Sequence, residues 1–264
     1  MSKLNKDVLI LILEELEDDI KSLYSCLLVN KTWYAKYCFS ELKFLHCYGN
    51  IKKDTLKGLA RISKSIKKLI LEFSNNNSGA IKLIDTQRNL CDVIFNRLMT
   101  NDESFCKVFE ELLIKHVDTI KYLKINWMPV TRSILYLVNL KSLEIDSFYY
   151  SNWTNCSYLE NLSLPSLKFL KVKRISSKIL VNLIENTRGL LTEICIDREG
   201  PKVESLELFF ENWKGKNRNP MLLQTSYSTL KYFNLTEKYK AEGIIKKYYH
   251  NLSESTFENF EWLD

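Results

Sequence analysis

Apolar residues in the first forty positions recur at helical spacing and predict three short helices over residues 4–37. One face of the first helix is made of Val8, Leu9, Ile12, Leu13 and Leu16. Ile10 and Leu11 are apolar too, so this helix is hydrophobic nearly all round, which is unlike an ordinary surface helix. The acidic stretch 14–19 ends it, and residues 21–29 and 31–37 form the second and third helices.

This N-terminal segment is too small to support a hydrophobic core alone. Domains below about 40 residues usually need disulfides, a metal or a partner. The segment has no closely spaced Cys pair and no metal-binding motif. We therefore expect it either to dock on the following domain or to be completed by a second chain.

A different pattern begins near residue 54. Helical spacing predicts helices over 54–64, 88–99 and 104–116, and the polar loop 75–79 separates a strand from a helix. An apolar-x-x-apolar-x-apolar hexad recurs eight times, beginning at Ile66, Ile120, Leu140, Leu159, Leu167, Leu191, Val203 and Leu230. Recurrence at similar intervals is the mark of a repeat architecture.

The intervals between hexads indicate an irregular repeat. Intervals of 20, 19, 24 and 27 residues leave room for one short strand and a return connection, and the interval of 54 accommodates the two helices within 88–116. Intervals of 8 and 12 residues are too short for a full repeat, so we expect one hexad of each close pair to be spurious or part of a compressed turn.

The apolar residues of each hexad explain why such strands must stack. The last two alternate, so they point to one face of a short strand, and neighbouring strands are needed to bury that face. Ser176 and Ser177 cap a helix predicted over 178–186, with Gly189 beyond its end. The prediction is an α/β chain: three short N-terminal helices, then an irregular solenoid of short parallel strands alternating with helices.

The other face of each strand carries aromatic, polar and charged side chains, the composition of a protein-binding surface. The alternation places on this face Tyr122, Lys124, Asn126, Ser142, Glu144, Asp146, Phe169, Lys171, Lys173, Tyr232 and Asn234. The basic run 168–174 fits a contact to an acidic partner, or simply a solvated face.

Residues 4–33 resemble an F-box, and residues 66–235 resemble divergent leucine-rich repeats. The residues that match the F-box pattern are Leu4, Asp7, Val8, Leu9, Ile12, Leu16, Leu23, Cys26, Val29, Lys31 and Trp33. The chain departs at Asn5, where the family commonly has Pro and where Asn can cap the helix instead. The Asn or Cys that follows each hexad in the repeats is replaced by Met128, Phe148 and Ile175.

F-box proteins with leucine-rich repeats are substrate receptors of Skp–cullin–F-box ubiquitin ligases. The resemblance implies a non-catalytic adaptor with an F-box over residues 1–48 and a substrate-binding repeat domain over 49–264. The residues that would bind the Skp-type adaptor are Leu4, Asp7, Val8, Leu9, Ile12, Leu16, Cys26, Val29 and Trp33. Ubiquitin transfer would be performed by the recruited cullin–RING ligase and its conjugating enzyme.

Other functions compete with this one. The apolar N-terminal face could serve as a cap on the first repeat, as solenoids require. The repeats could also form a protein-interaction scaffold with no ligase link. Residues 1–48 have a net charge of −1 and the remainder +7, out of +6 for the whole chain, which is too weak a basic bias to indicate nucleic acid.

Composition disfavours most enzyme chemistry. Seven glycines are scarcely enough for a phosphate-binding loop, and none of the three histidines has a partner at catalytic spacing. The seven cysteines form no Cys-x-x-Cys pair, which favours reduced thiols. Cys38, His46 and Cys47 lack a fourth metal ligand. We expect no cofactor, no metal and no enzymatic activity.

No targeting segment is predicted. The apolar run 8–13 is shorter than the roughly 7–15 residues of a signal peptide, and no run approaches the roughly 20 residues of a membrane span. We expect a cytoplasmic or nuclear protein. No polar capping unit follows the last hexad, so we expect the array either to continue beyond residue 264 or to be closed by a helix over 243–252.

Overall fold

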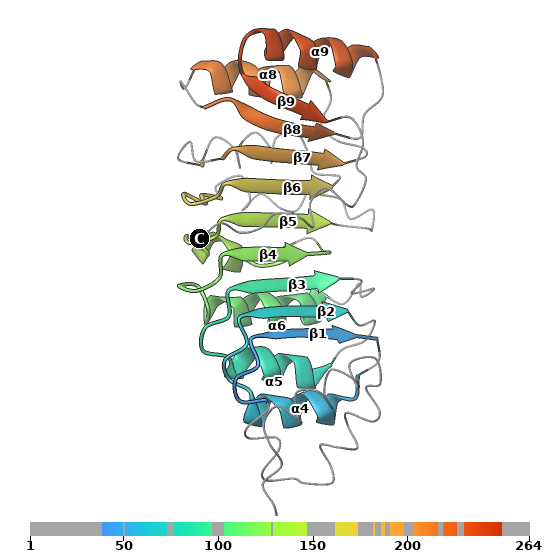
Figure 1. Cartoon of the computed structure of the whole chain (residues 1–264), viewed down its shortest axis with the longest axis vertical. Coiled ribbons are helices and arrows are strands. Elements are labelled where there is room, and N and C mark those ends of the chain that lie inside the picture. Colours follow the sequence, from blue (N-terminus) through green and yellow to red (C-terminus); the bar gives the residue numbers. More distant parts are fainter. Residues whose placement is uncertain are drawn as a thin grey trace, which may run out of the picture.

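A computed structural model describes residues 39–49, 51–72, 77–96, 103–127, 129–146, 162–173, 182, 186–187, 191–197, 203–215, 219–225 and 230–249. In these residues nine strands form one parallel sheet whose order follows the chain from β1 to β9 (Figure 1). The strands are β1 (Phe44–Tyr48), β2 (Lys68–Glu72), β3 (Asp92–Asn96), β4 (Tyr122–Ile125), β5 (Ser142–Asp146), β6 (Phe169–Lys173), β7 (Glu193–Asp197), β8 (Met221–Thr225) and β9 (Ile245–Tyr249).

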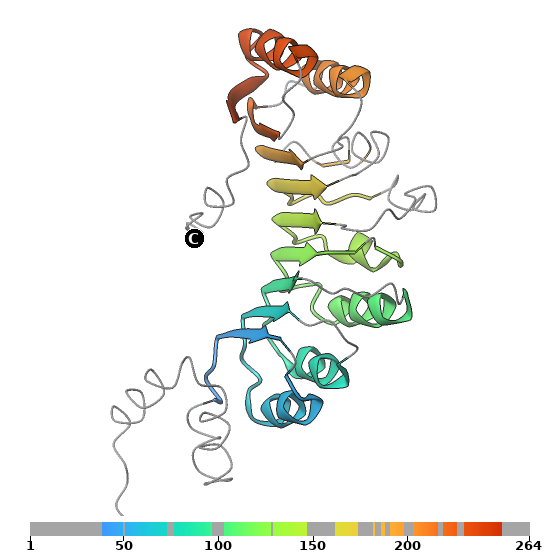
Figure 2. The same cartoon turned by 90° about the vertical axis from the view of Figure 1, so that its right-hand side faces the viewer.

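Helices alternate with the strands along the chain. Most lie on one side of the sheet, and the last described helix lies across the C-terminal end of the sheet (Figure 2). The helices are α4 (Lys53–Ile62), α5 (Ser78–Thr86), α6 (Glu103–Ile114), the 3-10 helix η1 (Ser133–Tyr136), α8 (Val203–Gly215) and α9 (Leu230–Ala241). We call the side that carries the helices the helical side, and the other side the open face. The fold is α/β, with parallel strands alternating with helices in a solenoid-like array.

The core lies between the sheet and its helices and is built in layers, one from each turn. In register, one inward-pointing position of each successive strand is occupied by Leu45, Leu69, Val93, Leu123, Leu143, Leu170, Ile194 and Leu223. The spacing of these positions shows that each turn takes 20 to 30 residues. From Leu69 onward they are at most 1% exposed, and each fully buried aliphatic side chain contributes roughly 1.5–3 kcal/mol.

Aromatic side chains fill the helical side between α6 and the sheet. Phe109 packs edge-on against Phe95 and Phe105, with ring centroids 5.0 and 4.6 Å apart, and Trp127 lies 4.9 Å from Phe95. Gly79 of α5 has no space for a side chain, because a Cβ there would lie 2.2 Å from the Lys53 carbonyl oxygen of α4. The first three helices are therefore tightly packed on one another and on the sheet.

The connection between β4 and β5 is organised by a buried carboxylate. Glu110 of α6, 3% exposed, accepts hydrogen bonds from the Trp127 indole (2.9 Å), the backbone N–H of Val130 (2.8 Å), and both the N–H and the hydroxyl of Thr131 (2.7 and 2.5 Å). Burial raises the pKa of Glu110, and these hydrogen bonds oppose the rise. One side chain thus satisfies the donors of an irregular segment that has no ladder partners.

The last two helices pack together at the C-terminal end of the described array. Phe210 of α8 contacts Tyr239 of α9, which is fully buried, and the Tyr239 hydroxyl donates to Glu211 at 2.7 Å. Gly243, with φ of 75°, ends α9: its N–H bonds to the Lys240 carbonyl and that of Ile244 to the Tyr239 carbonyl. This pair of hydrogen bonds is typical of a helix that ends at a glycine.

Several sequence predictions are confirmed. The hexads at Ile66, Ile120, Leu140, Leu167 and Leu191 lead into β2, β4, β5, β6 and β7, and the helices expected over 54–64 and 104–116 are α4 and α6. Of the close pair at Leu191 and Val203, only the first is a strand. The N-terminal helices over 4–37, most of the helix over 178–186 and the start of the hexad at Leu159 lie outside the described residues.

Three predictions are wrong. The helix expected over 88–99 is strand β3, because Val93 and Phe95 alternate into the core. The hexad at Leu230, which was expected to form a strand, lies in α9, where apolar residues recur at helical spacing. The helix expected over 243–252 does not form in its described part, where Gly243 ends α9 and residues 245–249 form β9.

Candidate binding surface

The parallel register brings most of the predicted binding residues together on the open face. Across β4, β5 and β6, one row contains Tyr122, Ser142 and Phe169, and the next contains Lys124, Glu144 and Lys171. Asp146 and Lys173 are paired in a third row. Eight of the eleven predicted residues therefore lie on three adjacent strands.

Glu144 is the centre of this group. It is 8% exposed, accepts a hydrogen bond of 2.5 Å from the Tyr122 hydroxyl, and lies 3.7 Å from the ammonium groups of both Lys124 and Lys171. Burial, and then the charge of Glu144, raise the pKa of Tyr122 far above its ordinary value, so this tyrosine is a hydrogen-bond donor at every physiological pH. A carboxylate of β5 is thus held by side chains from both neighbouring strands.

Three predicted residues lie outside this group. Asn126 follows β4 directly and is buried. Tyr232 was predicted on the sheet face, but it lies in helix α9 and is 9% exposed. Strand alternation does not apply to a helix, so Tyr232 is not part of the open face, and Asn234 is excluded for the same reason.

A second carboxylate on the open face has the same arrangement and was not predicted. Glu72 of β2 lies between His46 of β1, whose Nε2 is 3.2 Å from the carboxylate, and Asn96 of β3, whose side-chain amide donates to it at 2.9 Å. Beside it are Phe44, 51% exposed with the Lys68 ammonium 5.8 Å from its ring centre, and the exposed Tyr48. The open face therefore carries two carboxylates, each bridging three strands.

A sequence signal for this second group was present. The hexads Leu42-x-x-Leu45-x-Cys47 and Leu90-x-x-Val93-x-Phe95 precede and include β1 and β3. The first contains a cysteine as its last apolar residue, and the second also fits helical spacing. Cys47 is buried, which raises the pKa of its thiol to about 12, so it acts as an inert core residue.

The open face continues toward the C-terminus with less charge. Glu193 of β7, 8% exposed, lies in register between Phe169 and Leu222, and burial raises the pKa of its carboxyl. Cys195 of β7 and Gln224 of β8 occupy the next row and are buried. The charged and aromatic part of the surface is therefore interrupted at β7 and β8. It resumes at β9, where Lys247 and Tyr249 are exposed and the ammonium group lies 4.7 Å from the ring centre.

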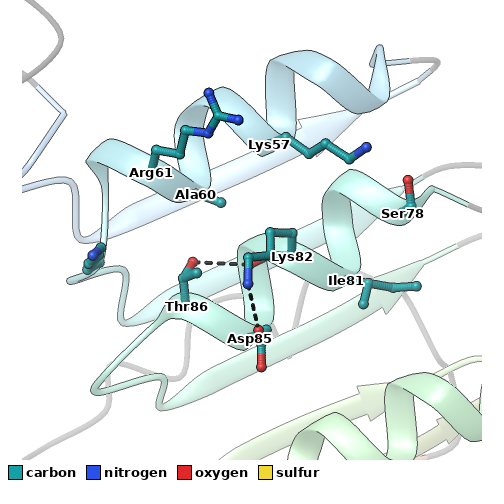
Figure 3. A pocket seen from close by; sticks show the side chains of 9 residues that line it. Lys57, Ala60, Arg61, Ser78, Ile81, Lys82, Asp85 and Thr86 are labelled. Carbon is teal, nitrogen blue, oxygen red and sulfur yellow. Dashed lines mark hydrogen bonds and ion pairs between the residues drawn. The ribbon is translucent and has the colours of Figure 1, made fainter.

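The helical side has a groove of about 590 Å³ between α4 and α5 (Figure 3). Its rim is basic, with Lys57, Arg61, Lys64 and Lys82, and its floor is partly apolar. Asp85 pairs with Lys82 at 3.1 Å and with Lys115, which together hold the pKa of the Asp85 carboxyl below its ordinary value. The remaining cations of the groove give it a positive character.

The described residues contain few side chains in arrangements suited to catalysis or metal binding. No three His, Cys, Asp or Glu side chains gather there in a way that could hold a metal ion. His116 is buried with its Nε2 3.0 Å from the Ile84 carbonyl oxygen, and burial lowers its pKa. The described cysteines Cys47, Cys91, Cys106 and Cys195 form no disulfide. None of the described helices combines the length and hydropathy needed to cross a bilayer.

Comparison with known proteins gives no family assignment. No family model, no curated protein and no solved structure matches this chain significantly. Function must therefore be inferred from the sequence motif and from the surface itself.

Proposed function

We propose that this chain is a non-catalytic, substrate-recruiting adaptor of a Skp–cullin–F-box ubiquitin ligase. Residues 4–33 would bind the Skp-type adaptor, and the open face would bind a substrate protein. The observation that carries the proposal is the order of parts: the F-box-like motif ends at Trp33, and an array of parallel strands begins at Phe44. No cofactor, nucleic acid or membrane takes part.

The array supports the substrate-binding half of the proposal. The hexads that resemble leucine-rich repeats lead into β2, β4, β5, β6 and β7, and each turn takes 20 to 30 residues. The open face presents partly exposed aromatics beside paired charges, which is the composition of protein-binding surfaces. Such an adaptor acts by raising the effective concentration of substrate lysines near the charged ubiquitin conjugate.

The proposal is tested by a pull-down of the purified chain with a Skp-type adaptor. The wild type is expected to form a complex, and the double variant Leu9→Asp with Trp33→Ala is expected to lose it. A matched control is Leu208→Asp with Tyr136→Ala, which alters two apolar side chains that are each 57% exposed elsewhere. Binding by the first double variant, with the fold intact, would overturn the assignment.

The alternative is a leucine-rich-repeat interaction scaffold with no ligase link. It rests on the open face alone and needs nothing from residues 4–33. Failure of the wild-type chain to bind any Skp-type adaptor, together with capture of protein partners that depends on Lys124 and Lys171, would favour it.

A further inference from the structure

One exposed lysine recurs at the same place in successive turns of the array. The residue immediately before each strand is Lys43, Lys67, Cys91, Lys121, Lys141, Lys168 and Thr192 for β1 to β7. The five lysines in this set, which we call the lysine column, are all exposed. They lie at the edge of the sheet where the strands begin, on the left in Figure 1.

Backbone hydrogen bonds fix this column in register. The carbonyl oxygen of Lys43 accepts from the N–H groups of both Lys67 and Lys68, and the same paired bonds recur at each later turn as far as Lys168, which accepts from Thr192 and Glu193. Neighbouring parallel strands lie about 4.8 Å apart. Lys121, Lys141 and Lys168 therefore project from backbone positions at about this spacing, and the whole column spans about 24 Å.

The charges of the column are not neutralised inside the described part of the chain. None of the five ammonium groups lies within ion-pair distance of a described carboxylate, whereas Lys124 and Lys171 on the open face are close to Glu144. Lys121 acts on Asp92 through its charge, but burial still raises the pKa of Asp92. Like charges at directly neighbouring strand positions destabilise a sheet. An anionic partner bound along the column would relieve the repulsion between its lysines.

Further cations widen the basic edge. Lys64 and Arg88 occupy the turns that lead into β2 and β3, and the carbonyl of Lys64 accepts from the N–H of Arg88. Lys64 also lines the groove of Figure 3 with Arg61 and Lys57, so the basic surface runs from the column onto the helical side. Asp118 is an exposed acid at this edge, in the turn before Lys121.

We propose that the lysine column binds an extended acidic segment, rich in Asp and Glu, of a partner protein. An extended peptide advances about 3.3 Å per residue and presents alternate side chains to one side, so about seven residues would cover the column. A single-stranded nucleic acid fits less well, because such ligands bind on open aromatic faces. Of the aromatic residues directly after a column lysine, Tyr122 and Phe169 are partly buried and only Phe44 is exposed. The proposal is independent of the ubiquitin-ligase assignment.

The test uses fluorescence polarisation of fluorescein-labelled octaglutamate with the full chain. We expect binding that weakens as salt is added, and no binding of labelled octaglutamine. The triple variant Lys121→Gln, Lys141→Gln, Lys168→Gln is expected to bind octaglutamate about tenfold more weakly. The matched control changes three exposed lysines elsewhere to Gln, at Lys107, Lys231 and Lys246, and is expected to bind nearly as well as the wild type.

Each other outcome overturns the proposal. Equal weakening by both triple variants would show a response to net charge alone, and no binding by the wild type would remove the site. Tighter binding of an eight-nucleotide oligothymidylate, lost in the same triple variant, would make the occupant a nucleic acid. A lower melting temperature of the column variant would show that the lysines stabilise the fold, since relief of repulsion should leave it unchanged or raise it.

Discussion

The two sides of the sheet each hold a buried carboxylate, and the two differ in what surrounds them. On the helical side, Glu110 receives four hydrogen bonds from neutral donors, all within residues 127–131. On the open face, Glu144 is held by a tyrosine and two lysines from neighbouring strands. The first holds a single connection in place, while the second is part of a charged surface whose lysines a ligand carboxylate could also use.

The contrast predicts its largest effect at Glu110. Glu110→Ala leaves four donors without their acceptor in a buried segment, so the free energy of unfolding should fall by about 3–5 kcal/mol. Chemical denaturation of the purified variant measures this. Glu111→Ala, at the exposed neighbour in α6, is the matched control and should change stability by less than about 0.5 kcal/mol.

The same substitution at Glu144 tests whether the open face tolerates the loss of its carboxylate better than the helical side does. Glu144→Ala frees a hydroxyl and two ammonium groups that can turn to water, so a loss of only about 1–2 kcal/mol is expected. An equal or greater loss than at Glu110 would contradict the view that the open face is the more tolerant side.

The next effect concerns how closely the helical side is packed. Gly79→Ala would place a Cβ 2.2 Å from the Lys53 carbonyl oxygen and 2.8 Å from the Leu56 Cβ, so α4 and α5 must separate. The free energy of unfolding, measured by chemical denaturation, should fall by about 1–3 kcal/mol. Gly58→Ala in α4 meets no atom within 4 Å and should instead stabilise the chain by about 0.5–1 kcal/mol. A neutral Gly79→Ala would show that the helices separate easily.

The smallest effect is a dependence on pH. Burial raises the pKa of Glu110, so the folded chain keeps a proton between the ordinary carboxyl value of about 4.3 and the raised value, where the unfolded chain has lost it. The free energy of unfolding should therefore fall as pH rises through this range. Because Glu110→Gln does not titrate, the stability of the wild type relative to this variant should decrease as pH rises above about 4. A difference that rises with pH would mean that the hydrogen bonds to the carboxylate outweigh its burial.

Much of the sheet was predictable because the apolar positions of the hexads that form strands are buried core residues. The hexad at Leu140 leads into β5, but the same pattern at Val203 lies in α8, so the hexad alone does not decide between strand and helix. Leu90, Val93, Ile94 and Leu98 satisfy helical spacing, while Leu90, Val93 and Phe95 satisfy the hexad. Periodicity alone could therefore not decide between helix and strand. In α8 the deciding residues, Phe209, Phe210 and Trp213, lie beyond the hexad and extend a helical face.

The candidate surface was predictable only where the strands were. Tyr122, Glu144 and Lys171 were placed on one face by alternation, but their contacts depend on a register between strands 20 and 27 residues apart. The Glu72 group was not predicted because β1 and β3 were not predicted. His46 and Asn96 come close to Glu72 only because these two strands pair with β2. Tyr232 was predicted on the open face but is not part of it, because it lies in helix α9.

The strictly sequential strand order also bears on how the chain is made. Each of β2 to β9 pairs with the strand that precedes it in sequence, so a turn can close on its template as soon as it leaves the ribosome. At roughly 5–20 residues per second, one turn of 20 to 30 residues takes about 1–6 s to synthesise. During growth, only one new strand edge at a time awaits its partner. Assembly from the N-terminal end, with β1 as the first template, therefore limits how long any unpaired strand is available for aggregation.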